Sequence, residues 1–225
     1  AIIACQPDEA ALLAHTCPAA HILSPRNKRH GVQQAVALGA TLILLDDAFH
    51  RTDIVRDIDI LTFGPPGLGN GLCLPAGPLR EPPSHATRAT CYVLQDCALP
   101  ASLSPKPTFS LTRHLHPATV AKLGQRPLVA FAGLAHPEAF FSHLRTAGLN
   151  VVESHAFPDH ATFNPTTLAT LLASAHQHHA TLICTEKDSP KLPPTFPHTV
   201  IPLVLQGQVP QLLMSLETHL KALKK

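Results

Sequence analysis

Short apolar runs alternate with helix-forming stretches along most of this chain, and that alternation limits the fold more than any other feature. In the first half, strands are expected at residues 1–5, 20–23, 41–45, 59–63 and 91–95, and helices at residues 8–15 and 31–39. In the second half, strands are expected at residues 128–131, 151–154, 181–185 and 200–205, and helices at residues 137–147, 165–176 and 209–223. Continuous apolar strands that alternate with helices are typical of βαβ units around a buried parallel sheet. The sequence therefore predicts an α/β protein.

Two stretches interrupt the alternation. Residues 64–71 read G-P-P-G-L-G-N-G and are too rich in proline and glycine for a regular element, so we expect a shaped loop there. Residues 100–107 are rich in proline and serine, which is typical of a connection. We therefore predict a boundary at this point, with a core domain over residues 1–107 and a C-terminal α/β lobe over residues 108–225.

Composition excludes several classes of protein. The formal net charge is only +2, from 17 basic and 15 acidic residues, which argues against nucleic acid as a main partner. The six cysteines form no C-x-x-C pair, so we expect reduced, buried thiols and neither a zinc cage nor a disulfide framework. No apolar run has the length of a membrane span, and no secretory signal follows Ala1. The 16 histidines are a compositional habit, so a single histidine carries little weight.

An acidic pair follows one of the expected strands. Residues 42–47 read L-I-L-L-D-D, and carboxylates at the end of a strand are how P-loop kinases hold magnesium. Asp46 and Asp47 are equally compatible with a cap on the following turn. The usual partner motif, G-x-x-x-x-G-K-[ST], is absent from the sequence. These residues alone leave both interpretations open.

Six stretches of the sequence resemble the motifs of a single protein family. Residues 46–51 read D-D-A-F-H-R and residues 56–60 read R-D-I-D-I, similar to the family's D-D-G-F-Q-H and R-D-[LI]-D-I. Residues 69–82 read G-N-G-L-C-L-P-A-G-P-L-R-E-P, similar to its G-N-G-x-L-L-P-A-G-P-L-R-E-P. Residues 130–141, 157–160 and 185–193 resemble A-F-A-G-I-x-x-P-x-x-F-F, F-x-D-H and T-E-K-D-x-x-K-L-P. The stretches occur in the family's order, and the long proline-glycine-arginine block makes the resemblance specific. The chain therefore resembles the tetraacyldisaccharide 4'-kinases of lipid A biosynthesis.

The resemblance implies a role for two residues that handle a proton. The segment around Asp8 is similar to the family's G-D-E-P motif, in which the aspartate is the catalytic base. Asp8 would take the proton from the 4'-hydroxyl of the glucosamine disaccharide, and His160 would pair with it and tune its basicity. Asp8 is also compatible with a surface position near a helix start.

The resemblance also implies a nucleotide site. Asp46 and Asp47 would position Mg²⁺ between the ATP phosphates. Arg80 and Glu81 would lie near the reacting phosphate, where a guanidinium stabilises charge on the phosphoryl oxygens. The sequence departs from the family pattern at Ala48, where the family has glycine, and at residues 50–51, which read H-R for Q-H.

The implied fold is a P-loop NTPase-like parallel sheet that lacks its first βα unit, with a smaller C-terminal α/β lobe. The family's ATP-gripping loop lies upstream, so the chain is predicted to be a fragment. The implied reaction is transfer of the γ-phosphate of ATP to the 4'-hydroxyl of a lipid A precursor disaccharide, at the cytoplasmic face of the bacterial inner membrane. One alternative is a non-catalytic remnant or a carbohydrate- or lipid-binding homologue, and another is a C-terminal lobe that acts as an interaction module.

Structural interpretations stay open for three further stretches. Residues 75–83 are equally compatible with a rigid scaffold around a site, Arg80 apart. Residues 185–188 are equally compatible with a turn after a strand. The histidines at 176, 178 and 179 look like a metal tract but have no acidic residue or cysteine beside them, so we expect them at the exposed end of a helix.

Overall fold

The computed structural model describes residues 1–3, 7–159 and 161–223, without the side chains of Pro7 and Asp8. The described chain divides into two compact units. Unit 1 comprises residues 1–46 and 114–204, and unit 2 comprises residues 47–113 and 205–225. The chain therefore passes from one unit to the other three times.

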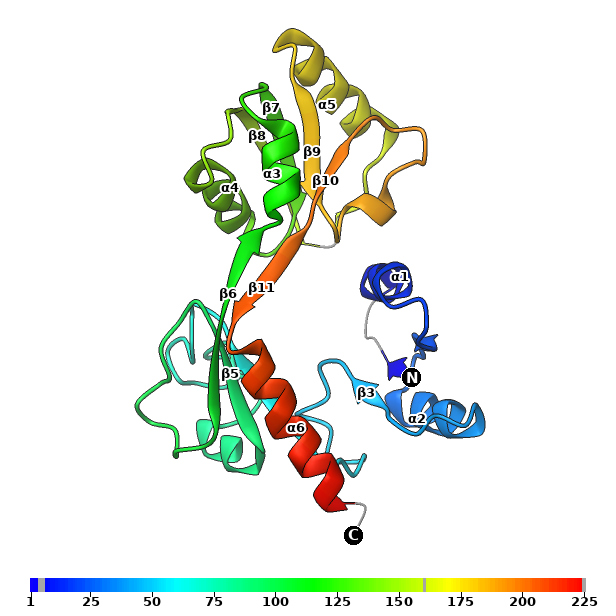
Figure 1. Ribbon diagram of the computed structural model, residues 1–225, viewed down its shortest axis with the longest axis vertical. Helices are drawn as coiled ribbons and strands as arrows, with labels where there is room; N and C mark the ends of the chain where they lie inside the picture. Colours follow the sequence, from blue (N-terminus) through cyan, green and yellow to red (C-terminus); the bar gives the residue numbers. More distant parts are fainter. Residues whose placement is uncertain (4–6, 160, 224–225) are drawn as a thin grey trace. The chain divides into compact units, whose positions relative to one another are not determined.

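A four-stranded parallel sheet forms the centre of unit 1 (Figure 1). Its order is β10-β9-β7-β8, with β7 at Leu128–Gly133, β8 at Val151–Phe157, β9 at Thr181–Thr185 and β10 at Thr199–Ile201. Successive residues of a strand point to opposite faces, and β7 buries both of its faces. Leu128, Ala130 and Ala132 belong to one hydrophobic core, whereas Val129 and Phe131 belong to another. A strand apolar at every position is thus buried between two layers.

Helices cover the two faces of this sheet. Helices α3 (Pro117–Leu123) and α4 (Pro137–Thr146) contribute to the core that contains Leu128, and α5 (Pro165–Gln177) contributes to the core that contains Phe131. Each of these helices begins with proline. Proline has no backbone N–H, and an N–H in the first turn of a helix would have no partner within the helix, so proline suits this position. The Asn164 side chain caps α5 by accepting from the Thr167 N–H at 2.8 Å.

Unit 1 also contains a small parallel sheet near the N-terminus. Its order is β2-β1-β3, formed by Ile2–Ile3 (β1), Ile22–Leu23 (β2) and Leu44–Leu45 (β3). Helix α1 (Pro7–Thr16) connects β1 to β2, and α2 (Lys28–Ala37) connects β2 to β3. Gly39 follows α2 with a φ of 76°, a left-handed conformation that suits glycine at the end of a helix.

Unit 2 is built on a sheet of order β11-β6-β5-β4. The strands are β4 (Ile60–Phe63), β5 (Cys91–Gln95), β6 (Thr108–Leu115) and β11 (Leu203–Gly207), accompanied by the 3-10 helix η1 (Pro83–Arg88) and α6 (Val209–Leu223). Phe63 and Tyr92 meet edge to face at 5.6 Å between ring centroids, in a core that also contains Ala86 and Leu94. This core fixes η1 against the sheet, which matters for the site described below.

The predicted α/β architecture with parallel strands is confirmed, and several elements differ from their expected bounds. The run at residues 200–205 was expected to be one strand, but Pro202 separates β10 from β11 because proline has no N–H for the ladder. Strand β6 and helix α3 were not predicted. The domain boundary after residue 107 stays a prediction. The cysteines of the described chain are free thiols, and no helix among the described residues is long and apolar enough to cross a membrane.

Candidate nucleotide and proton-transfer site

The acidic pair lies where the chain leaves unit 1. Asp46 follows β3, and its N–H donates to the Ile3 carbonyl at 3.0 Å. The Asp46 carbonyl oxygen accepts from the Nζ of Lys28, a buried lysine. Asp47 begins unit 2 and has a φ of 44°, a left-handed conformation that aspartate tolerates better than most residues. The backbone therefore turns sharply directly after the strand and exposes both carboxylates.

Within unit 2, Asp47 contacts the arginine of the proline-glycine-arginine block. Arg80 Nη1 donates to Asp47 Oδ2 at 2.6 Å and lies 3.4 Å from His50 Nδ1. His50 Nδ1 lies 3.8 Å from Asp47 Oδ1. The structure thus brings together Asp47 and Arg80, which are far apart in sequence, and adds His50.

Glu81, the next residue, is held by η1. Arg88 Nη2 donates to Glu81 Oε2 at 2.5 Å, and His85 Nδ1 lies 3.2 Å from the same oxygen. Arg88 also donates to the Phe49 carbonyl at 3.2 Å and lies over the Phe49 ring, 4.8 Å from its centroid. Arg88 therefore fixes Glu81 and the loop after Asp47 at the same time.

Two of these supporting residues had no role in the sequence interpretation. Arg88 and His85 lie in a 3-10 helix, which has no apolar periodicity to reveal it. Arg56 belongs to the R-D-I-D-I motif, from which no role was predicted for it. It donates to the carbonyls of Phe49 (3.3 Å), Ile54 (2.9 Å) and Arg51, and it pairs with Asp59. The signal that could have identified Arg56 is its place as the arginine of the R-D-I-D-I motif.

The glycines and asparagine of residues 69–79 build the loop that presents Arg80. The Asn70 side chain donates to the Ala76 carbonyl at 2.9 Å and accepts from the Leu72 N–H at 3.1 Å. A Cβ on Gly77 would lie 2.2 Å from Asn70 Oδ1 and 2.3 Å from the Leu72 carbonyl oxygen, so only glycine fits there. These contacts hold the loop in a defined shape, and a scaffold role for residues 75–83 stays a prediction.

A cavity of about 220 Å³ in unit 2 gathers these side chains. Its polar lining includes Asp47, His50, Arg80 and Glu81, and its apolar lining includes Phe63, Leu68 and Leu79. Carboxylates beside a guanidinium suit the recognition of a cation and of phosphate oxygens. Among the described residues, no group of three or more histidine, cysteine, aspartate or glutamate side chains gathers to hold a metal.

The expected proton-transfer pair cannot be located in the same way. Asp8 lies on α1, but its side chain is outside the described part of the molecule, and His160 is outside the described residues altogether. The residues on both sides of His160 are described: the Ala161 N–H donates to the Pro158 carbonyl at 3.0 Å, so a turn closed by Pro158 and Ala161 follows β8. The pairing of Asp8 with His160 stays a prediction.

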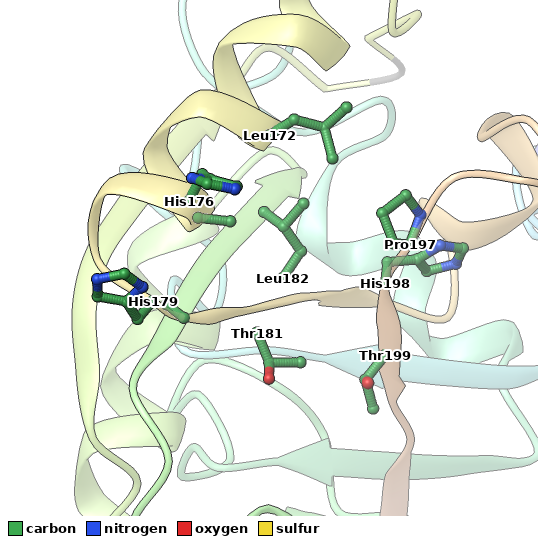
Figure 2. Close-up of a pocket in the computed structure, with 10 residues that line it drawn as sticks. Leu172, His176, His179, Thr181, Leu182, Pro197, His198 and Thr199 are labelled. Carbon is green, nitrogen blue, oxygen red and sulfur yellow. The ribbon is translucent and has the colours of Figure 1, made fainter.

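A second, larger hollow lies elsewhere in unit 1 (Figure 2). It has a volume of about 560 Å³, is lined by Leu172, Leu182 and Pro197, and includes His176, His179 and His198. Thr181 and Thr199, which also line it, are the first residues of β9 and β10, so the hollow lies at the amino ends of these parallel strands. Ligands of open parallel sheets bind at the carboxyl ends. The motif residues at 185–188 lie at the carboxyl end of β9, opposite to this hollow, so the hollow does not have the usual position of a ligand site.

Fold and site together define a class. A parallel α/β sheet has an acidic pair directly after one strand, and in unit 2 a glycine-built loop presents Arg80 to Asp47, as expected of a phosphate-handling α/β protein. The structure is similar to the crystal structure of "apo" form LpxK from Aquifex aeolicus in complex with ATP, with a TM-score of 0.67, 26% identity, and coverage of 95% of this chain and 69% of that chain. The likeness extends over nearly the whole of this chain.

The family follows from the sequence comparisons. The family model for tetraacyldisaccharide-1-P 4'-kinase, LpxK, matches residues 6–221, and the chain belongs to this family. It is 35% identical over 230 residues to the tetraacyldisaccharide 4'-kinase of Bradyrhizobium sp. strain BTAi1, covering 94% of this chain and 65% of that protein. It is 37% identical over 196 residues to that of Nitrobacter hamburgensis, covering 82% and 57%. The chain therefore spans less than two thirds of the curated relatives it matches.

Proposed function

We propose that this chain is the greater part of an ATP-dependent kinase that phosphorylates the 4'-hydroxyl of tetraacyldisaccharide 1-phosphate to form lipid IVA. The observation that carries the proposal is the family match over residues 6–221, which contains all six candidate site residues. Phosphoryl transfer needs positioning and charge stabilisation more than covalent chemistry. The residues of the site supply both.

Asp46 and Asp47 are the proposed ligands of Mg²⁺. Magnesium is usually held by one or two carboxylates, with the remaining positions filled by phosphate oxygens and water. The two exposed carboxylates after β3 fit this chemistry. When bound, Mg²⁺ neutralises charge on the ATP phosphates.

Arg80 and Glu81 are the proposed contacts to the reacting phosphate. Arg80 is 57% exposed at its side chain and already directs a guanidinium N–H toward the carboxylate of Asp47. The same N–H groups suit phosphoryl oxygens. Glu81 is held by Arg88 and His85 and is positioned beside Arg80 by its place in the chain.

Asp8 is the proposed base that removes the proton of the 4'-hydroxyl, and His160 is its proposed partner. The support is the likeness of the segments around both residues to the family motifs. An imidazole beside a carboxylate holds it in the charged form at neutral pH and so keeps it able to accept a proton.

The proposed partner is the lipid A precursor disaccharide, and the proposed location is the cytoplasmic face of the bacterial inner membrane, as a peripheral protein. The name of the family supports an acylated disaccharide as the substrate. An acylated substrate resides in a bilayer, so the enzyme must reach the bilayer surface. No part of the proposal calls for nucleic acid.

Two experiments test this function. First, the coding DNA upstream of Ala1 is read for G-x-x-x-x-G-K-[ST], which the proposal expects in frame. Second, the segment of the Bradyrhizobium relative that has no counterpart in this chain is joined to it, and transfer of labelled phosphate from ATP to tetraacyldisaccharide 1-phosphate is measured. We expect transfer by this chimera and none by residues 1–225 alone. A folded chimera that binds ATP and the disaccharide without transfer would favour a non-catalytic binding homologue.

A further inference from the structure

Asp188 is a fully buried carboxylate in unit 1. Its relative exposure is 0%, in a part of the chain for which the sequence allowed a simple turn. Aspartate is almost never fully buried unless its charge is paired and its oxygens are hydrogen-bonded. The groups around Asp188 therefore indicate what the residue holds in place.

Three groups donate to this carboxylate. The Gly133 N–H donates to Oδ2 at 3.0 Å, the Thr185 hydroxyl donates to Oδ2 at 2.7 Å, and Lys191 Nζ donates to Oδ1 at 3.1 Å. Gly133 ends β7, Thr185 ends β9, and Lys191 lies in the 3-10 helix η2 (Ser189–Lys191). One side chain thus ties the carboxyl ends of two neighbouring strands to η2.

A second segment approaches the same strand end at Gly133. A Cβ at this position would lie 3.0 Å from Asp188 Oδ1, and 3.4 Å from both the Pro158 carbonyl oxygen and the Ala161 Cβ. The first distance is tight, whereas the other two are ordinary van der Waals contacts, so the turn closed by Pro158 and Ala161 lies against the end of β7 without requiring glycine there. The turn and the Asp188 carboxylate therefore both pack on the end of β7.

The turn has a further anchor directly beside Asp188 in the chain. Lys187 Nζ pairs with Asp159 Oδ1 at 3.2 Å, and the side chains are only 22% and 38% exposed. The backbone after β9 consequently holds the turn through Lys187 and holds β7 through Asp188. By its place in the sequence, His160 lies between the two anchored residues Asp159 and Ala161.

Helix α1 reaches the same region, since it packs beside η2. Asp8 belongs to this helix. The described residues next to both members of the proposed proton-transfer pair thus adjoin the Asp188 centre: Asp159 and Ala161, which flank His160 in the sequence, and helix α1, which contains Asp8.

We propose that Asp188 is a positioning residue, which orders the end of β7, the turn closed by Pro158 and Ala161, and the η2 segment, and so supports proton transfer by the residues proposed as the base and its partner. The proposal rests on the proposed function and deepens it. Asp188 acts through its neighbours and takes no proton itself.

The first test is hydrogen–deuterium exchange on residues 1–225, which requires no enzymatic activity. Asp188→Asn keeps the size of the side chain but replaces one acceptor oxygen with a donor group. We expect faster exchange at the Ala161 and Gly133 amides by about 10-fold or more, with α4 unchanged, because the anchor on the end of β7 is weakened. Asp53→Asn, which changes the exposed partner of Arg51, is the matched control and is expected to leave these amides as in wild type. Unchanged exchange in Asp188→Asn would overturn the proposal.

The second test is kinetic and uses the chimera. We expect Asp188→Asn to lower kcat about 10- to 100-fold with both KM values nearly unchanged, because misplaced proton-transfer groups affect the transition state and not substrate binding. In the double variant Asp188→Asn, Lys191→Met, removal of the charge that faced the Asp188 carboxylate is expected to recover thermal stability but not kcat. Recovery of both would assign Asp188 a merely structural role and overturn the proposal. A wild-type chimera without transfer would refute the proposed function, while the exchange experiment still decides whether Asp188 orders the turn.

Discussion

Arg80 and Asp47 form a 2.6 Å ion pair although the two side chains are 57% and 49% exposed. Exposed pairs of this kind contribute only about 0–1 kcal/mol to stability, because water competes for both charges and the side chains lose freedom. The pair joins a residue in a left-handed turn to one that directly follows the loop at residues 69–79, and both side chains line the cavity. A small contribution to folding is therefore compatible with the role proposed for both residues at the ATP phosphates.

The first prediction concerns Arg80. We expect Arg80→Ala to lower phosphate transfer by the chimera about 10²- to 10³-fold, since a charge aimed at the phosphoryl oxygens is lost. The free energy of unfolding should change by less than about 1 kcal/mol. Arg51→Ala is the matched stability control, because Arg51 forms an exposed pair with Asp53 at the same 2.6 Å. A loss of stability in Arg80→Ala far beyond that of Arg51→Ala would assign the pair to folding.

The second prediction concerns Gly77. A Cβ here would overlap the Asn70 side chain and the Leu72 backbone, so Gly77→Ala must displace the loop at residues 69–79. We expect the free energy of unfolding to fall by about 1–3 kcal/mol in urea denaturation, as is usual for overpacking. Gly64→Ala is the control, since its Cβ would meet only Pro66 Cδ at 3.9 Å. Equal stability of the two variants would show that the loop is soft and that Arg80 is not held by it.

Much of the fold was predictable because buried strands and amphipathic helices have simple signatures. Strands β5 and β9 and helix α6 have the expected bounds, since each is a short apolar run or a period of 3.6 residues flanked by turn-forming sequence. Strand β6 was missed although Phe109, Leu111 and Leu115 alternate with polar residues, because the prolines before it suggested a connection. Pro202 indicates that residues 200–205 belong to two strands, but it lies within an apolar run, which suggests a single strand.

The site was predictable only where sequence blocks carried it. Resemblance brought Asp47, Arg80 and Glu81 into one hypothesis, and the structure places Asp47 in contact with Arg80. The sequence could not indicate that Arg88 serves both Glu81 and Phe49, because those contacts depend on how η1 packs on Tyr92 and Phe63. Nor could it indicate that Asp188 is buried, since an aspartate in a charged turn is ordinarily exposed.

The third prediction concerns pH. Glu153 accepts a hydrogen bond from Ser174, which lowers the pKa of its carboxyl group, and the nearby His155 and His178 lower it further. A carboxylate whose pKa is lower in the folded than in the unfolded state stabilises the fold above the unfolded value, about 4.3, and loses that contribution as the pH falls through the folded value. We expect the difference in free energy of unfolding between wild type and Glu153→Gln to shrink as the pH falls below about 4.

The measurement is urea denaturation at a series of pH values. Glu217→Gln is the control, because Glu217 lies on α6 with only a distant pairing to Lys221, at 3.7 Å. Its difference from wild type should be small at every pH. A Glu153→Gln difference that does not change with pH would mean that the serine and histidine contacts do not favour the charged carboxylate.

The last prediction concerns Asp8, whose role comes from the family resemblance. In the chimera, we expect Asp8→Asn to lower kcat by about 10²- to 10⁴-fold, the usual contribution of a general base, with the affinity for ATP nearly intact. The reason is that a base for the 4'-hydroxyl acts on the acceptor, whereas Asp46, Asp47 and Arg80 act on the nucleotide. Nucleotide affinity from calorimetry and turnover from the labelled-phosphate assay separate these two effects. If Asp8→Asn kept full turnover, Asp8 would have no part in proton removal. If ATP affinity fell together with kcat, the residue would belong to the nucleotide site, and the division of labour between the two groups of carboxylates would be wrong.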